Sequence, residues 1–190
     1  MRLTGERVYL DMLTREDCRR IFELTEFDPD ALVEQPCIGF GPERADDWYA
    51  DIQRRQCDTH VRLGIYVRAD DGARGELVGD VALQDINWRD RRCSVGIGMA
   101  RLSDRGRGYG TEALKLMLGY GFDALGLERI EARTLDVNKR AQRLLERVGF
   151  VREGCERAAV YLGGARRDRL MYGMLRDEWA QVKLECACGR

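Results

Sequence analysis

One segment of this 190-residue sequence has residue types and spacing suited to binding an anion. It lies between a strand-like and a helix-like run and reads Arg105-Gly106-Arg107-Gly108-Tyr109-Gly110-Thr111. Glycines allow turns with positive φ, so successive backbone N–H groups can converge on one anion at the start of the next helix, where the helix dipole favours negative charge. The segment therefore predicts a phosphate or pyrophosphate site. The alternative is a glycine-rich turn that only packs a helix closely on a sheet.

Two common phosphate-binding motifs fit this segment poorly. The Walker motif ends in Gly-Lys-Ser/Thr, which is absent, and the dinucleotide-binding fingerprint requires a glycine where Thr111 stands. A nucleotide-dependent dehydrogenase is therefore a weak alternative. A hydrolase is disfavoured as well, because His60 is the only histidine and no Gly-x-Ser-x-Gly motif is present. We expect His60 at the surface, at the start of a strand.

Alternating apolar patterns, helical periodicity and turn signals predict the elements that position this segment. Strands are expected at residues 7–12, 61–68, 76–86, 93–99, 129–136, 151–160 and 167–175. Helices are expected after an N-cap at Thr14, over 43–57, over 114–125, after an N-cap at Asn138, and from Arg176 onward. This order predicts a mixed α+β fold with one domain over residues 1–190.

Composition narrows the function classes. The 32 basic and 33 acidic side chains give a net charge of -1, so there is no simple electrostatic basis for binding nucleic acid. No apolar segment resembles a membrane span or an export signal, which favours a cytoplasmic protein. The seven cysteines are scattered and lack zinc-type spacing, so we expect free thiols and no metal site.

Four segments, taken in order, resemble the GNAT superfamily of acyl-CoA-dependent N-acyltransferases. Arg105-x-x-Gly108-x-Gly110 is similar to the pyrophosphate loop of that family, and Asn138-x-x-Ala141-x-x-Leu144-Leu145-Glu146-x-x-Gly149-Phe150 is similar to its following helix. Two further segments resemble the RimJ/RimL-type branch: Glu6-Arg7-Val8-Tyr9-Leu10 with Thr14-x-x-Asp17, and Phe150-x-x-Glu153-Gly154 with Gly164 and Asp168. The resemblance implies a mostly antiparallel central sheet flanked by helices, in which a splayed pair of strands forms the acyl-CoA cleft.

The resemblance also implies roles for individual residues toward acetyl-CoA or another acyl-CoA. Main-chain groups of Ile97, Gly98 and Met99 would bond the pantetheine arm, and an N–H near Gly98 or Met99 would polarise the thioester carbonyl. The backbone of residues 105–111 would hold the pyrophosphate. The remaining contacts implied are Asn138 to the pantetheine or acyl end, with helix capping as the alternative, and Arg140 and Arg143 to the 3′-phosphate, with a solvated helix face as the alternative.

The implied reaction is direct acyl transfer to a primary amine in a ternary complex. Many relatives carry a general-acid tyrosine where this chain has Leu145, and some carry a serine where it has Ala141. The remaining acid–base candidates are Ser94, Glu112 and Glu153. Because the expected polar groups are missing, a non-catalytic acyl-CoA sensor is an alternative, and a succinyl-type acyltransferase is another.

The acceptor amine is left open between a protein N-terminal α-amine and a small-molecule amine. Trp48, Tyr49 and Trp88 are candidates to line the acceptor pocket, with ordinary packing as the alternative. Dimerisation through the C-terminal strands is a further open expectation.

Overall fold

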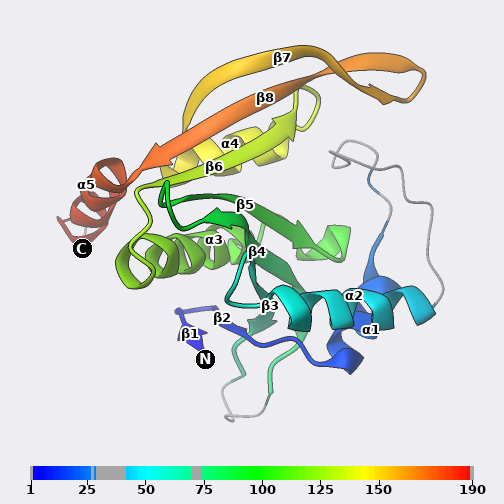
Figure 1. Cartoon of the computed structure of the whole chain (residues 1–190). Helices are drawn as coiled ribbons and strands as arrows, with labels where there is room; N and C mark the ends of the chain where they lie inside the picture. Colours follow the sequence, from blue (N-terminus) through cyan, green and yellow to red (C-terminus); the bar gives the residue numbers. More distant parts are fainter. Residues whose placement is uncertain (1, 27, 29–41, 70–73, 189–190) are drawn as a thin grey trace.

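The strands of the computed structural model, which describes residues 2–26, 28, 42–69 and 74–188, form one eight-stranded sheet (Figure 1). Its order is β1-β2-β3-β4-β5-β6-β8-β7. The strands are β1 (Leu3–Thr4), β2 (Val8–Asp11), β3 (Val61–Val67), β4 (Leu77–Asn87), β5 (Arg92–Met99), β6 (Arg129–Leu135), β7 (Val151–Leu162) and β8 (Ala165–Leu175). All neighbours are antiparallel except β5 and β6, which are parallel. The expected mixed, mostly antiparallel sheet is therefore confirmed.

Helices cover both faces of this sheet. They are α1 (Arg15–Leu24), α2 (Pro42–Arg55), α3 (Tyr109–Gly119), α4 (Lys139–Val148) and α5 (Arg176–Cys188), with a short 3-10 turn η2 (Leu102–Asp104) before the glycine segment. Alternation along β2 shows the two faces. Val8 and Leu10 belong to the large core cluster that includes Leu114 and Met117 of α3, whereas Tyr9 packs in a second cluster with Ile21 of α1.

Local signals fix the ends of several helices. Thr14 caps α1 through a capping box with Asp17, and the Asn138 side chain accepts a hydrogen bond from the Ala141 backbone at the start of α4. Both N-caps match the sequence-based expectation. The helix expected at 114–125 begins earlier, at Tyr109, and continues as a π-helical turn η3 (Tyr120–Ala124).

The parallel pair β5 and β6 separates after a short contact. Its pairing register covers only three positions, from Arg92 opposite Arg129 to Ser94 opposite Glu131. Beyond that point β5 stays paired with β4 as far as Met99, and β6 stays paired with β8 as far as Leu135. Figure 1 shows the two strands diverging. The backbone of β5 from Val95 to Met99 therefore has no strand partner on its β6 side, as the implied splayed pair requires.

The structure tests the expectations for His60 and for the cysteines. His60 was expected at the surface but is buried, with 8% of its surface exposed, because it closes the turn that links α2 to β3 and its ring packs against Arg55 and Thr59. Cys18, Cys57, Cys93 and Cys155 are free thiols. Cys37 lies outside the described residues, as do the side chains of Cys186 and Cys188. None of the described helices is long and apolar enough to cross a membrane.

Candidate active site

A cavity of about 1090 Å³ lies beside the part of β5 that no longer pairs with β6. It is lined by residues from β5, from the glycine segment and from the start of α4. All the residues expected to bind acyl-CoA line this cavity, except Arg107 and Tyr109: Ile97, Gly98, Met99, Arg105, Gly106, Gly108, Gly110, Thr111, Asn138, Arg140 and Arg143. The fold therefore brings together segments that are far apart in the sequence.

The glycine segment forms a turn that only glycine adopts readily. Gly106 and Gly108 have φ values of 80° and 88°, in the left-handed region. The first N–H groups of any α-helix have no partner within the helix. Gly108, the N-cap of α3, has no side chain that could accept from them. A Cβ at Gly106 would meet nothing within 4 Å. These features fit an anion cradle of backbone N–H groups.

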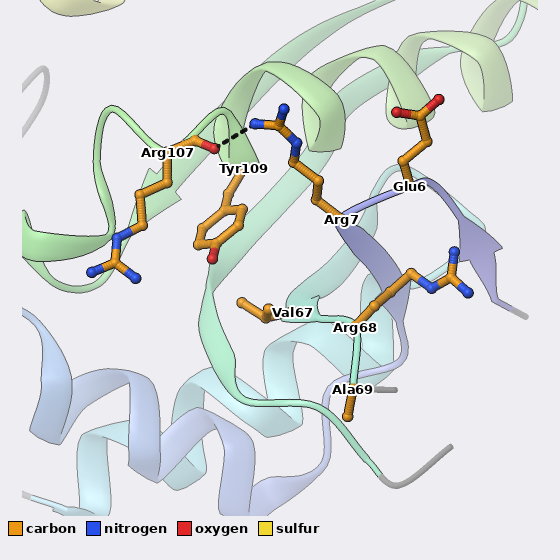
Figure 2. A pocket seen from close by; sticks show the side chains of 7 residues that line it. All are labelled: Glu6, Arg7, Val67, Arg68, Ala69, Arg107 and Tyr109. Atoms are coloured by element: carbon orange, nitrogen blue, oxygen red, sulfur yellow. Dashed lines mark hydrogen bonds between the residues drawn. The ribbon is translucent and has the colours of Figure 1, made fainter. Parts of the chain in front are cut away.

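The other side of this turn is tied to the N-terminal strands. Arg7 Nη1 donates a hydrogen bond to the carbonyl oxygen of Arg107 at 3.0 Å. The carboxylate of Glu112 accepts hydrogen bonds from the backbone N–H groups of Glu6 and Arg7. Figure 2 shows the pocket of about 550 Å³ on this side, which Arg107 and Tyr109 line. Arg107, Tyr109 and Glu112 thus lie away from the large cavity.

The start of α4 presents both a cap and cavity-lining side chains. Asn138 Oδ1 accepts the hydrogen bond from the Ala141 backbone N–H at 3.0 Å, and Asn138 also lines the cavity. Capping and ligand contact are therefore compatible for this residue. Leu145 is buried in the core, with 5% of its surface exposed, whereas Leu144 and Ala141 line the cavity. The described part of this helix offers apolar groups where many relatives have polar ones.

The guanidinium group of Arg105 is held by the carboxylate of Asp28, four residues after the end of α1. Arg105 Nη1 forms an ion pair with Asp28, and Arg140 Nη1 lies 3.8 Å from the same carboxylate. Only 15% of the Arg105 side chain is exposed. Asp28 was not singled out from the sequence, because no motif surrounds it. It brings a negative charge to the arginines nearest the glycine turn.

The three acid–base candidates lie outside the cavity lining. Ser94 Oγ contacts the backbone oxygen of Gln84 at 3.4 Å, and it is four residues from Gly98 along β5, or roughly 13 Å at the rise of a strand. Glu153 pairs with Arg129 at 2.7 Å, and the Arg129 guanidinium lowers the pKa of the Glu153 carboxyl. Glu112 binds backbone groups of the N-terminal turn, as described above.

A different carboxylate, Asp80 of β4, does line the cavity. It lies directly opposite Gly98 in the pairing of β4 with β5, and it forms an ion pair with Arg62 of β3. The side chains of both charged residues are mostly buried. Trp48 of α2 lies over the Arg62 guanidinium, 5.4 Å from ring centroid to Cζ. A charged residue inside the apolar run from Leu77 to Leu83 was the available sequence signal, and it was missed.

Of the three aromatic residues expected to line the acceptor pocket, only Trp48 lines the cavity. Trp48 lines the cavity, and Phe22 packs against it at a centroid distance of 5.5 Å. Trp88 is 47% exposed and donates from Nε1 to the Asp58 carbonyl oxygen, while Tyr49 lies below the Arg15 guanidinium. Neither of these two lines the cavity. No group of three or more His, Cys, Asp or Glu side chains in the described segments is arranged to hold a metal ion.

Three features place this protein among the acyl-CoA-dependent acyltransferases. They are its α+β fold, the parallel strands β5 and β6 that separate after a short pairing, and the glycine turn that lines the adjacent cavity. Residues 7–151 match the family model of the acetyltransferase (GNAT) domain, and the chain belongs to this family. It is accordingly an N-acetyltransferase.

Curated relatives match nearly the whole chain. The Bacillus subtilis protein "Putative ribosomal N-acetyltransferase YdaF" is 25% identical, over 94% of this chain and 97% of its own length. The B. subtilis protein "Probable N-acetyltransferase YjcK" is 30% identical, over 93% of this chain and 98% of its own length. The first of these names agrees with the RimJ/RimL-type resemblance.

Solved structures share the fold. The spermidine N-acetyltransferase from Vibrio cholerae, in complex with CoA and spermine, superposes with a TM-score of 0.75. It is 22% identical, over 93% of this chain and 99% of its own. At this identity the likeness supports the architecture of the sheet and its helices.

Proposed function

We propose that this protein transfers the acetyl group of acetyl-CoA directly to a primary amine, with both substrates bound in the cavity beside β5. The observation that carries the proposal is the meeting, in one cavity, of the unpaired edge of β5, the glycine turn and the start of α4. Holding a thioester and an amine together makes the attack effectively unimolecular, so no covalent intermediate on a cysteine is required.

The lining residues fit an acyl-CoA molecule from end to end. The N–H groups after Gly106 and Gly108 would bind the pyrophosphate, because they lie at a helix N-terminus without partners inside the helix. Arg140 and Arg143 line the same end and would meet the 3′-phosphate. The unpaired β5 edge at Ile97, Gly98 and Met99 would bond the pantetheine arm, and an N–H at Gly98 or Met99 would polarise the thioester carbonyl.

The acceptor proposed here is a primary amine that is protonated in water. Four carboxylates line the cavity, and all belong to described residues: Glu26, Asp28, Asp80 and Asp104. Arg105, Arg140, Arg143 and Arg147 line the cavity too, so its lining as a whole is not negative. A carboxylate that faces the acceptor, however, favours a cation over a neutral or acidic molecule. The names of similar proteins offer two classes of such amine, a ribosomal protein for one relative and spermidine or spermine for one structural neighbour.

A glycine substitution tests the cofactor end of the cavity. Gly106→Glu places a carboxylate where the pyrophosphate is proposed to bind, without a steric clash, because a Cβ there meets nothing within 4 Å. We expect at least a tenfold loss of acetyl-CoA affinity, measured by calorimetry. Gly164→Glu is the matched control, since Gly164 has φ of 79°, equally open surroundings, and a place in the remote turn between β7 and β8. Equal affinity in Gly106→Glu and the wild-type protein would remove the proposed role of the turn.

A screen of acyl-CoA donors against amines tests the reaction itself. Acetyl-CoA and succinyl-CoA would be combined with spermidine, single amino acids and peptides with free N-termini, and release of the CoA thiol would be followed. We expect thiol release with acetyl-CoA and at least one amine. Binding of acetyl-CoA without turnover on any amine would contradict the proposed transfer in this cavity, and preference for succinyl-CoA would support the succinyl-type transferase.

A further inference from the structure

Asp80 occupies a place in the cavity that no acid–base candidate from the sequence reaches. It lines the cavity beside Gly98, the residue whose main chain is proposed to contact the reacting thioester. A Cβ built on Gly98 would have one neighbouring heavy atom within 4 Å, Asp80 Oδ1 at 3.6 Å. The space above the Gly98 main chain is thus open within the described residues, except for this carboxylate oxygen.

The alternation of β5 separates this side of the sheet from the side that holds the glycine turn. Ile97 and Met99 point toward α3, because a Cβ on Gly110 would lie 3.8 Å from Ile97 Cδ1 and from Met99 Sδ. Gly98, between them, faces the opposite side, as successive residues of a strand do. Asp80 is on that opposite side, together with Arg62 and the Trp48 ring from α2. An amine that enters over α1 and α2 would therefore meet Asp80 next to the thioester.

The Asp80 carboxylate is also held in place. Arg62 Nη1 donates to Oδ2, which leaves Oδ1 as the oxygen nearest Gly98. The Arg62 guanidinium is fixed in turn by the Trp48 ring above it, a cation–π contact. A carboxylate with one oxygen engaged and one directed at the reacting region is suited to accepting a hydrogen bond from an amine.

The other carboxylates of the cavity are engaged differently. Asp28 pairs with Arg105 at the cofactor end, and Glu26 accepts a hydrogen bond from the Leu102 backbone N–H. Asp104 is 94% buried in the turn that precedes the glycine segment, next to Arg101. None of these three is opposite a β5 residue in the sheet pairing. Asp80 is therefore the cavity carboxylate best placed for the chemical step.

We propose that Asp80 is a catalytic residue that binds the acceptor amine beside Gly98 and accepts its proton during acetyl transfer, and that Arg62 is the residue that positions it. This inference rests on the proposed function and names the group that the sequence did not supply. Proton transfer by a positioned carboxylate contributes about 10²- to 10⁴-fold to such reactions.

The proton and electron balance of the step is complete. The bound ammonium loses one proton to water, and the neutral nitrogen then attacks the thioester carbon, so a C–N bond forms while the C=O π pair moves to oxygen. Asp80 Oδ1 takes the second proton from nitrogen. The carbonyl re-forms, the C–S bond breaks with its electron pair on sulfur, and the thiolate takes a proton from water. Asp80 returns its proton to water, so each transfer yields the amide, the CoA thiol and one proton.

Asp80→Asn tests the proposal with an almost isosteric change. We expect kcat for the best amine of the screen to fall at least tenfold, with acetyl-CoA affinity within twofold of the wild-type protein. Asp85→Asn is the control, because Asp85 is an exposed carboxylate on the same strand, outside the cavity lining. A kcat for Asp80→Asn within tenfold of the wild-type value would overturn the proposal.

Loss of one partner of a mostly buried ion pair can destabilise a fold. If Asp80→Asn does not fold, the double variant Arg62→Gln/Asp80→Asn replaces both charges with amides, and Arg62→Gln alone serves as its reference. A positioning role for Arg62 predicts that Arg62→Gln raises KM for the amine and leaves acetyl-CoA affinity unchanged. It also predicts that the double variant has a kcat at least tenfold below that of Arg62→Gln, and equal kcat values would overturn the proposal.

A binding measurement separates this inference from the proposed function. Spermidine is titrated into the CoA complexes of the wild-type protein and of Asp80→Asn. A tenfold loss of spermidine affinity in the variant supports the Asp80 site even if the wild-type protein shows no turnover in the screen. Equal affinity for spermidine, or no uptake of spermidine by the wild-type complex, overturns the Asp80 site while leaving thiol release as the test of the reaction.

Discussion

The imidazole of His60, directly before β3, is held between two polar side chains. Arg55 Nη1 lies 3.0 Å from Nε2, and Thr59 Oγ1 lies 3.3 Å from Nδ1. A guanidinium group can only donate, so Nε2 accepts and the imidazole is neutral in this arrangement. Burial lowers the pKa of His60, and the positive charge of Arg55 lowers it further. Protonation of this residue in the folded state is therefore unfavourable.

This environment predicts a pH dependence of stability. The pKa of His60 is lower in the folded chain than its unfolded value of 6.5. The contribution of neutral His60 to the stability of the folded protein is therefore fully present above pH 6.5. It is lost as the pH falls toward the pKa of His60 in the folded protein. We expect the free energy of unfolding to decrease less between pH 7.5 and pH 5.5 in His60→Gln than in the wild-type protein. Urea unfolding at the two pH values measures these free energies. Equal decreases in the two proteins would contradict a neutral, buried His60.

At the scale of elements, hydrogen bonds from the connection between β1 and β2 hold the start of α3 in place. Arg7 holds the Arg107 carbonyl oxygen, and Glu112 in the first turn of α3 accepts from the Glu6 and Arg7 backbone. Figure 2 shows the first of these contacts, between Arg7 and Arg107. These hydrogen bonds between the β1–β2 connection and the start of α3 stabilise the shape of the glycine turn.

A substitution at Glu112 distinguishes this structural role from acid–base catalysis. Hydrogen bonds to a charged group contribute about 1.5–3 kcal/mol each at most in such settings. We expect Glu112→Gln to lower the free energy of unfolding by about 1 kcal/mol, since the site is partly exposed, and to reduce kcat by less than threefold. Unfolding curves and steady-state rates measure the two quantities. A hundredfold loss of kcat with unchanged stability would instead assign Glu112 to the chemical step.

At the scale of the whole molecule, the net charge of -1 is compatible with a strongly anionic substrate. The proposed phosphate site consists largely of backbone N–H groups, which net charge does not count. Arg140, Arg143 and Arg147 of α4 line the cavity, and Asp28 lies beside Arg105 and Arg140, whereas Asp80 lines the cavity from β4. The cavity thus combines arginines, which we propose to meet the cofactor, with the Asp80 carboxylate, which we propose to meet the amine.

Ligand-induced stabilisation tests this arrangement in the intact protein. A ligand at 100 times its Kd stabilises the folded state by about 2.7 kcal/mol. For a chain of this size that corresponds to a rise in Tm of roughly 5–10 °C. We expect such a rise with acetyl-CoA and none with NAD, measured by thermal unfolding. No rise with acetyl-CoA, or an equal rise with NAD, would contradict the proposed cofactor site.

Local signals in the sequence determined the order of elements and the cofactor end of the site. Caps at Thr14 and Asn138 and glycines at a helix start are read from neighbouring residues, because their effects act within one turn of chain. The glycine turn at 105–111 was recognisable for the same reason. The extent of the domain over residues 1–190 and the dimer through the C-terminal strands stay predictions.

Only the tertiary structure decided which side chains meet at the acceptor end. The placement of Asp80 opposite Gly98 depends on the pairing register of β4 with β5, and a shift of one residue would turn Asp80 to the other face. The cavity itself depends on β5 and β6 parting after Ser94, a long-range event that no local pattern encodes. Ser94, Glu112 and Glu153 had suitable chemistry in the sequence. The fold directs them elsewhere, because side-chain direction follows from strand pairing and helix packing.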